Sequence, residues 1–162
     1  MYIYSGTVLA TLNKSLSPSN SLFSIAGSIT NSNGTLKLLN AGPSLVAGDT
    51  FTIFNQSVLN GVAMTIVSPG FTVKNNLAVD GSVMVTGVQP RPIITTTVEG
   101  NQLNLSWPSA WTGGVILQSQ ANPITTGLST NWVTIAGTDA SNTYSTTISK
   151  TNGCVFYRLT AP

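Results

Sequence analysis

Short stretches of alternating hydrophobic and polar residues run along the whole chain, with turn residues between them. The clearest stretch is GNQLNLSWP at 100–108, which alternates Asn101, Asn104 and Ser106 with Leu103, Leu105 and Trp107. A period of two places alternate side chains on opposite faces of a β-strand, and Pro108 ends this strand because it has no backbone donor. No window has the apolar spacing and cap of a helix, so the pattern predicts an all-β chain.

The first half of the chain contains seven candidate strands. They are Tyr2–Leu12 (interrupted at Ser5-Gly6), Phe23–Ile29, Thr35–Leu39, Thr50–Phe54, Met64–Val67, Phe71–Val73 and Leu77–Val85. The stretches FSIAGSI (23–29) and LAVDGSV (77–83) share one pattern, which is typical of stacked rungs in a β-solenoid. Any two alternating strands with a glycine bulge look similar. The N-terminal part is therefore predicted as solenoid-like rungs or a small β-sandwich.

A proline-rich stretch, VQPRPI at 88–93, separates this part from the rest of the chain. Prolines favour a stiff, extended connection and do not sit in the centre of a sheet. Beyond it, six short strands are bounded by Gly, Asn or Pro, as in a small sandwich: Ile94–Val98, Gln102–Trp107, Val115–Gln120, Trp132–Ile135, Tyr144–Ile148 and Val155–Leu159. The predicted organisation is a β-rich unit at 1–88, a hinge at 89–93 and a sandwich at 94–162.

Charged residues are scarce, which narrows the function. The chain has six Lys and Arg, four Asp and Glu and no His, whereas an average globular domain is about a quarter charged. The basic residues are scattered, so no nucleic-acid surface is expected. Without His, and with the carboxylates isolated at Asp49, Asp80, Glu99 and Asp139, neither a nucleophile–base pair nor a paired-carboxylate site forms. We expect no enzyme, no cofactor and no transition-metal site.

Two further features bear on the protein's location. Cys154 is the only cysteine, so no intrachain disulfide is possible. No run approaches the roughly 18 apolar residues of a membrane helix. Solubility must come from hydroxyls and amides, as in many extracellular and repeat-rich β proteins, so we expect an extracellular or cell-surface location.

The second half resembles a fibronectin type III or immunoglobulin-like module, at LNLSWP, GVILQSQ, NWVTIAG and VFYRLTAP. The resemblance implies that Trp107 and Tyr157 pack together. The chain is also similar to the C-terminal end of verrucomicrobial surface proteins with autotransporter-associated β-strand repeats, at LNKSLSPSNSL, AGPSLVAGDTFTIFN, NNLAVDGSV, NQLNLSWP, LSTNWVTIAG and NGCVFYRL. That group implies an extracellular solenoid-like passenger ending in a sandwich, with no catalytic residues. This chain departs from it by having only one or two rungs.

The number of predicted strands suggests a site for assembly. A fibronectin-like sandwich has about seven strands, and this one has an evident six. The last strand then has an open edge that can accept another strand, at Val155, Phe156, Tyr157, Arg158 and Leu159. The candidate donor is Tyr2–Leu12 of the same or a neighbouring chain, with Tyr2, Ile3, Tyr4, Val8, Leu9 and Leu12 as its apolar residues.

Aromatic residues provide the alternative function. Trp111 lies in the loop SAWTGG, and Trp111 and Trp132, together with Tyr2 and Tyr4, are candidates for a sugar-binding platform. Loop aromatics also cap the open ends of small sandwiches, and both interpretations stay open. The sequence favours a non-catalytic structural or adhesive protein that associates with itself into fibres or with a neighbouring surface protein. The alternative is a polysaccharide-binding module of a secreted protein.

Overall fold

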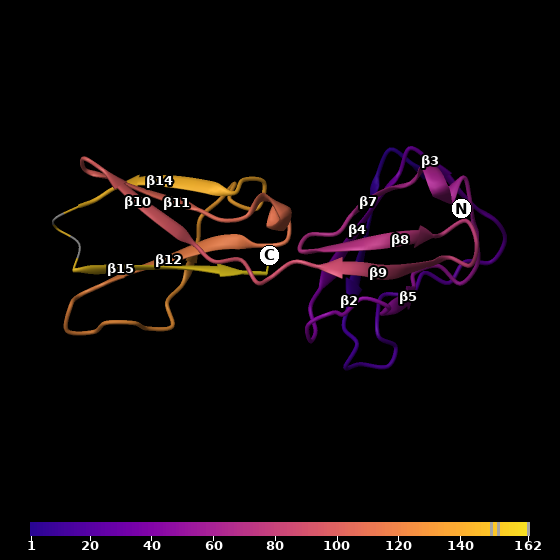
Figure 1. The fold of residues 1–162 in the computed structure, drawn as a ribbon, viewed down its shortest axis with the longest axis horizontal. Coiled ribbons are helices and arrows are strands. Elements are labelled where there is room, and N and C mark those ends of the chain that lie inside the picture. The colour runs from indigo at the N-terminus through magenta and orange to yellow at the C-terminus, as the bar shows by residue number, and fades with distance from the viewer. Residues whose placement is uncertain (150, 152, 162) are drawn as a thin grey trace. The chain divides into compact units, whose positions relative to one another are not determined.

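The structure, a computed structural model, describes residues 1–149, 151 and 153–161. These residues form strands and loops, with two single-turn 3-10 helices, η1 (Gly61–Ala63) and η2 (Ser109–Trp111) (Figure 1). The prediction of an all-β chain is confirmed. The chain divides into two compact units, Met1–Gln89 and Pro90–Pro162, and the division falls at the predicted hinge.

The N-terminal unit contains two three-stranded sheets, and the strands within each sheet run parallel to one another. One has the order β1-β3-β6 and the other the order β2-β4-β7; the strands are β1 (Tyr2–Tyr4), β2 (Thr7–Leu12), β3 (Ile29–Ser32), β4 (Thr35–Asn40), β6 (Val58–Leu59) and β7 (Thr65–Val67). Thr7 lies opposite Thr35, which lies opposite Thr65, so successive turns of the chain take 28 and then 30 residues. Parallel strands stacked turn upon turn form a short solenoid of three rungs.

The similarity of two stretches that suggested rungs does not extend to their pairing. LAVDGSV is not a rung, because β9 pairs antiparallel, and that part of the prediction is wrong. FSIAGSI takes part in the parallel pairing through its two ends, Phe23, which bridges to Phe54, and Ile29. In FSIAGSI only Ile29 belongs to a strand, the start of β3, and in LAVDGSV the turn at Leu77–Asp80 precedes β9. The shared glycines explain the difference, because Gly27 and Gly81 have φ of 85° and 78°. A positive φ is incompatible with an extended strand, so each Gly-Ser pair leads from a turn into a strand.

A third sheet closes the unit. β5 (Thr50–Thr52) and β8 (Phe71–Asn76) both pair antiparallel with β9 (Ser82–Val88), in the order β5-β9-β8. One hydrophobic cluster fills the unit, and its largest fully buried members come from all three sheets and the loops beside them: Leu12, Ile29, Leu36, Leu38, Ile53, Phe54, Val58, Leu77, Val83 and Val85. Burial of these side chains is the main stabilising contribution to the unit.

A buried asparagine links two rungs. Asn31 is 2% exposed, and its Oδ1 accepts the backbone N–H of Gly34 at 2.9 Å. Its Nδ2 donates to the carbonyl of Asn60 on the next rung, and Asn60 Nδ2 donates back to the carbonyl of Asn31, both at 3.2 Å. These bonds satisfy polar groups at a corner of the solenoid, where the strand ladder is interrupted.

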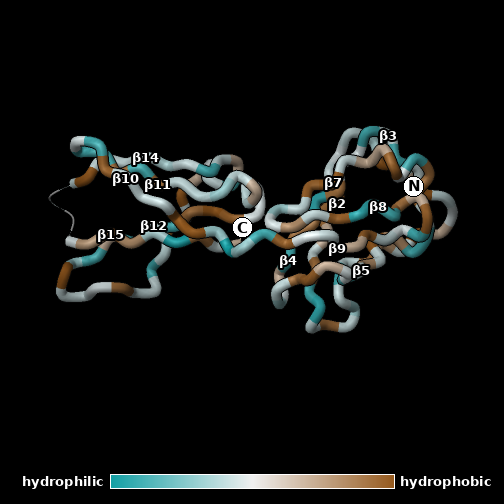
Figure 2. The backbone as a smooth tube through the Cα atoms, viewed as in Figure 1, coloured by the Kyte–Doolittle hydropathy of each residue, from teal (hydrophilic) through white to brown (hydrophobic). Residues whose placement is uncertain are grey.

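The C-terminal unit is a sandwich of two antiparallel sheets. One has the order β10-β11-β14 and the other β13-β12-β15; the strands are β10 (Thr95–Glu99), β11 (Gln102–Ser106), β12 (Ile116–Asn122), β13 (Val133–Thr134), β14 (Thr143–Thr147) and β15 (Cys154–Thr160). Its core holds Leu105, Trp107, Val115 and Leu117, and Tyr157 is among the partly buried residues packed against this cluster. The backbone tube in Figure 2 is brown, the colour of hydrophobic residues, in part of the loop after β12. Ile124 and Leu128 belong to this loop and are exposed.

Candidate functional site

Strand β15 is an edge strand of its sheet. It pairs with β12 through seven consecutive residue pairs, from Ile116–Thr160 to Asn122–Cys154, without a bulge. Among the described residues, no strand lies on its other side. The edge strands β10 and β14 have five residues each and β13 has two, so β15 is the longest edge of this unit. It contains all five residues predicted as the strand-exchange edge.

Hydrogen bonds of β12 determine which backbone groups of β15 are free. Leu117 donates its N–H to Thr138 Oγ1 at 3.0 Å and accepts the N–H of Ile135 at 2.9 Å, so its backbone faces β13. Antiparallel strands alternate the direction of these groups, so Gln118 faces its partner Arg158 on β15. The N–H and C=O groups of the odd-numbered residues of β15 therefore point to the open edge; these residues are Val155, Tyr157 and Leu159.

The same three residues direct their side chains toward the core. Tyr157 and Leu159 pack against the core cluster but are only partly buried, and Val155 is 37% exposed. Burial raises the pKa of the Tyr157 hydroxyl, and nearby Tyr144, whose ring lies 6.4 Å away, raises it further, partly offset by a hydrogen bond to Thr146. Incomplete burial of inward-facing apolar side chains beside an open edge is what a further strand would correct.

The only charged residue of β15 is held away from its open edge. The Arg158 guanidinium carbon lies 4.2 Å from the centre of the Trp132 ring, and Arg158 Nε donates to Gln118 Oε1 at 2.8 Å. Gln118 Nε2 in turn donates to Thr134 Oγ1 on β13. Arg158 therefore extends across β12 toward β13. Natural edge strands are often protected by a charge, a proline or a bulge, and the open edge of β15 has none of these.

The candidate donor segment lies in the solenoid. Tyr2–Leu12 forms β1 and β2, the first rung, which pairs with β3 and β4. Ile3 is 5% exposed and Leu12 is fully buried, whereas Val8 is half-buried and Leu9 is 52% exposed. The prediction that this segment fills the edge of β15 within its own chain is wrong, because its alternating pattern serves the solenoid core.

The two tryptophans of the predicted sugar platform both make contacts within the sandwich. Trp111 packs against the sandwich core and donates its Nε1 hydrogen to the Pro90 carbonyl at 3.0 Å. One face of Trp132 is covered by Arg158. Both rings therefore have structural contacts, and both remain partly exposed. Tyr2 and Tyr4, in contrast, are exposed and stack on each other.

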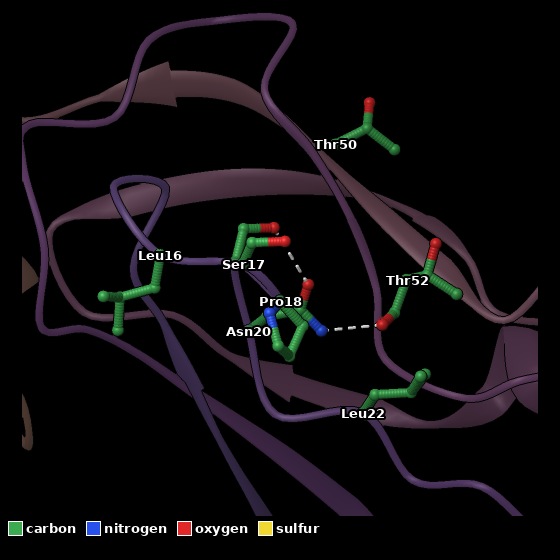
Figure 3. Close-up of a pocket in the computed structure, with 8 residues that line it drawn as sticks. Leu16, Ser17, Pro18, Asn20, Leu22, Thr50 and Thr52 are labelled. Carbon is green, nitrogen blue, oxygen red and sulfur yellow. Dashed lines mark hydrogen bonds between the residues drawn. The ribbon is translucent and has the colours of Figure 1, made fainter.

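A hollow in the N-terminal unit is lined by uncharged residues (Figure 3). They are Leu16, Ser17, Pro18, Ser19, Asn20, Leu22, Thr50 and Thr52. Asn20 Nδ2 donates to the Thr52 carbonyl at 2.7 Å, and Ser19 Oγ donates to Asn20 Oδ1 at 3.4 Å. The polar groups of Asn20 therefore hold the loop to β5, and the hollow presents no acid, base or nucleophile pair for chemistry.

Two of the carboxylates, Asp49 and Asp80, have structural partners. Asp49 accepts the Val46 N–H at 2.9 Å and pairs with Lys14 at 3.0 Å, and these two bonds, the backbone one first, lower the pKa of Asp49. Asp80 accepts the Ser82 N–H at 3.0 Å. Within residues 1–149, 151 and 153–161, no three His, Cys, Asp or Glu side chains gather as metal ligands.

Comparisons with protein-family models, with curated proteins and with solved structures find no match to this chain. In the part of the chain that the structure describes, no helix has the length and hydrophobicity needed to span a membrane.

Proposed function

We propose that this chain is a non-catalytic structural and adhesive protein of the bacterial cell surface or extracellular matrix, which assembles into fibres by strand complementation. The observation that carries the proposal is the open edge of β15: seven residues long, regular and unprotected. An added strand would hydrogen-bond to the outward backbone groups of Val155, Tyr157 and Leu159. Its alternate side chains would extend the inward apolar face.

The proposed occupant of this edge is a strand from a second copy of the chain. Tyr2–Leu12 is the candidate donor because β1 and β2 are the end strands of the two parallel sheets, so their release leaves the β3–β6 and β4–β7 pairs intact. The release also breaks the short antiparallel bridge between Leu12 and Asn20. Ile3, Ala10 and Leu12 would leave the solenoid core, and every second residue of the released segment would be buried again beside β15 of the second copy. Donor and acceptor surfaces differ, so the contact is heterologous and produces a filament where it does not close into a ring.

The composition of the chain and its resemblance to bacterial surface proteins support the proposed extracellular or cell-surface location. A chain with only ten charged residues among 162 is stabilised and solubilised mainly by uncharged groups. The solenoid followed by a sandwich is the arrangement that the resemblance to verrucomicrobial repeat proteins implied. The function we infer therefore consists of strand pairing and apolar burial, with no chemical step.

A proline substitution tests the acceptor edge. Val155→Pro removes an outward N–H and leaves the bonds of β15 to β12 in place, since proline is tolerated where the N–H faces solvent. Val155→Ala is the matched control, because it truncates the same side chain and keeps the N–H. We expect the wild type and Val155→Ala to form concentration-dependent assemblies in sedimentation and electron microscopy, and Val155→Pro to remain monomeric with unchanged circular dichroism. A monomeric wild type, or assembly by the folded proline variant, contradicts the proposal.

A reversible disulfide tests the donor. Leu9 and Lys37 are neighbours on β2 and β4, and adjacent strands bring Cα atoms within the range that a disulfide requires. Leu9→Cys/Lys37→Cys, in a Cys154→Ser background, should lock the first rung and block assembly until a reductant is added. Assembly by the oxidised variant would show that Tyr2–Leu12 is not the donor.

A further inference from the structure

We infer that Tyr2 and Tyr4 form a binding platform for a neutral polysaccharide chain on the outer face of the solenoid. The two residues lie on β1 with Ile3 between them, so Ile3 points into the core and both tyrosines point outward. Tyr2 is 67% exposed and Tyr4 is 66% exposed. Their ring centroids are 5.9 Å apart with an angle of 21° between the planes. Two large, nearly parallel aromatic rings therefore stay in solvent on one strand.

The platform has a rigid base and polar neighbours. The register places Thr30 beside Tyr2 and Ser32 beside Tyr4 on β3, and both neighbours are half-buried. The Met1 ammonium donates to the Ser28 carbonyl at 2.7 Å and the Thr30 N–H donates to the Met1 carbonyl at 2.9 Å, so β1 is fixed at its start. The rings are thus held on a paired strand, with hydroxyl groups along one side.

This combination fits a sugar. A pyranose ring offers an apolar C–H face, which stacks on an aromatic ring, and an edge of hydroxyls, which exchange hydrogen bonds with protein hydroxyls. The two rings are stacked, so each keeps one outer face on which a sugar unit can pack. Strands β1, β3 and β6 carry no charged side chain, so the side chains of this sheet offer no opposite charge to an anionic or cationic ligand.

The inference extends the adhesive part of the proposed function and does not depend on assembly. It requires the first rung to be seated in the solenoid, whereas strand donation requires the rung to leave. The oxidised Leu9→Cys/Lys37→Cys variant (Cys154→Ser background) separates the two, because it should retain polysaccharide binding and lose assembly. Failure of either proposal can therefore be recognised without the other.

The experiment is a binding assay on cellulose, chitin and an insoluble β-1,3-glucan, followed by titration with the soluble oligosaccharide of any polysaccharide that retains the protein. We expect Tyr2→Ala/Tyr4→Ala to weaken binding about tenfold or more, on the scale of one or two lost aromatic contacts. Tyr2→Phe/Tyr4→Phe keeps both rings and should bind within about threefold of the wild type. Leu9→Ala, at another exposed apolar residue of the first rung, should bind like the wild type.

Three results would overturn the inference. The first is a wild type that binds none of the three polysaccharides. The second is a Tyr2→Ala/Tyr4→Ala variant that binds as well as the wild type. The third is a Leu9→Ala variant that loses as much affinity as the double alanine variant, since binding would then follow the general apolar surface of the rung and not the paired rings.

Discussion

Substitution of Asn31 by alanine should destabilise the solenoid and leave the sandwich unaffected. Asn31 contributes two side-chain hydrogen bonds, which alanine cannot make. The bond to the Gly34 N–H is buried, and leaving a buried donor without a partner costs about 1–3 kcal/mol. The bond to the Asn60 carbonyl is only partly buried, so water can replace it and its loss costs about 1 kcal/mol. The expected loss in free energy of unfolding is about 2–4 kcal/mol.

The distribution of tryptophan provides the assay. All three tryptophans, Trp107, Trp111 and Trp132, lie in the C-terminal unit, so tryptophan fluorescence follows the sandwich alone, and circular dichroism follows both units. In a urea titration, circular dichroism should show the unfolding of the solenoid as a transition that tryptophan fluorescence does not report. Asn31→Ala should move the midpoint of this transition to a lower urea concentration and leave the fluorescence midpoint unchanged.

A second variant at the same position sharpens the test. Asn31→Asp keeps the acceptor for the Gly34 N–H, but its carboxylate is buried and faces a carbonyl. Burial raises a carboxyl pKa, so the stability of this variant should be greatest in acid, where the group is neutral, and fall as the pH rises through the folded-state pKa. A loss below about 0.5 kcal/mol for Asn31→Ala, typical of an ordinary surface position, would refute the role assigned to this residue.

Two further predictions concern a glycine and a tyrosine. Gly81 and Gly48 both have positive φ, but a Cβ on Gly81 would lie 2.4 Å from the backbone oxygen of Phe54, whereas one on Gly48 would meet nothing within 4 Å. Gly48→Ala should therefore lower the free energy of unfolding by about 1 kcal/mol, from backbone strain alone, and Gly81→Ala by about 3 kcal/mol or more. Urea unfolding measures both losses, and equal losses would contradict the clash. The raised pKa of Tyr157 favours its neutral form in the folded state, so its contribution to stability is complete below the ordinary tyrosine pKa and is lost as the pH rises through the folded-state pKa. Tyr157→Phe should therefore reduce the fall in stability at alkaline pH. An unchanged pH profile of stability would show that ionisation of Tyr157 does not cause that fall.

Patterns within a single strand predicted much of the fold. Leu103, Leu105 and Trp107 point to one side because alternation is a local property, and Leu105 and Trp107 are buried as expected. The sequence predicted solenoid-like rungs as one alternative but not which strands pair, because the residues that pair, such as Thr7 and Thr35, are 28 positions apart. No local signal marks that register. The Gly-Ser pairs shared by FSIAGSI and LAVDGSV mark places where a turn leads into a strand, and they do not mark the register.

The candidate site was predictable in part for the same reason. The number of strands can be counted along a sequence, and an edge beside the last strand follows from that count. The reach of Arg158 to Trp132 could not be predicted, since it depends on the cross-strand pairing of β15 with β12 and on the loop that leads into β13. The exposed pair Tyr2 and Tyr4 does carry a signal, two aromatic residues at i and i+2 around one aliphatic residue.

The unequal lengths of the solenoid turns show which corner accommodates an extra residue. From Thr30 to Thr35 the chain takes five steps, but from the paired Leu59 to Thr65 it takes six, and the extra residue falls in the corner that contains η1. Both flanking strands keep their register despite it. Val62, within that corner, is 78% exposed. Corners therefore absorb insertions while the sheets remain aligned, so this position can carry an added loop or a displayed peptide.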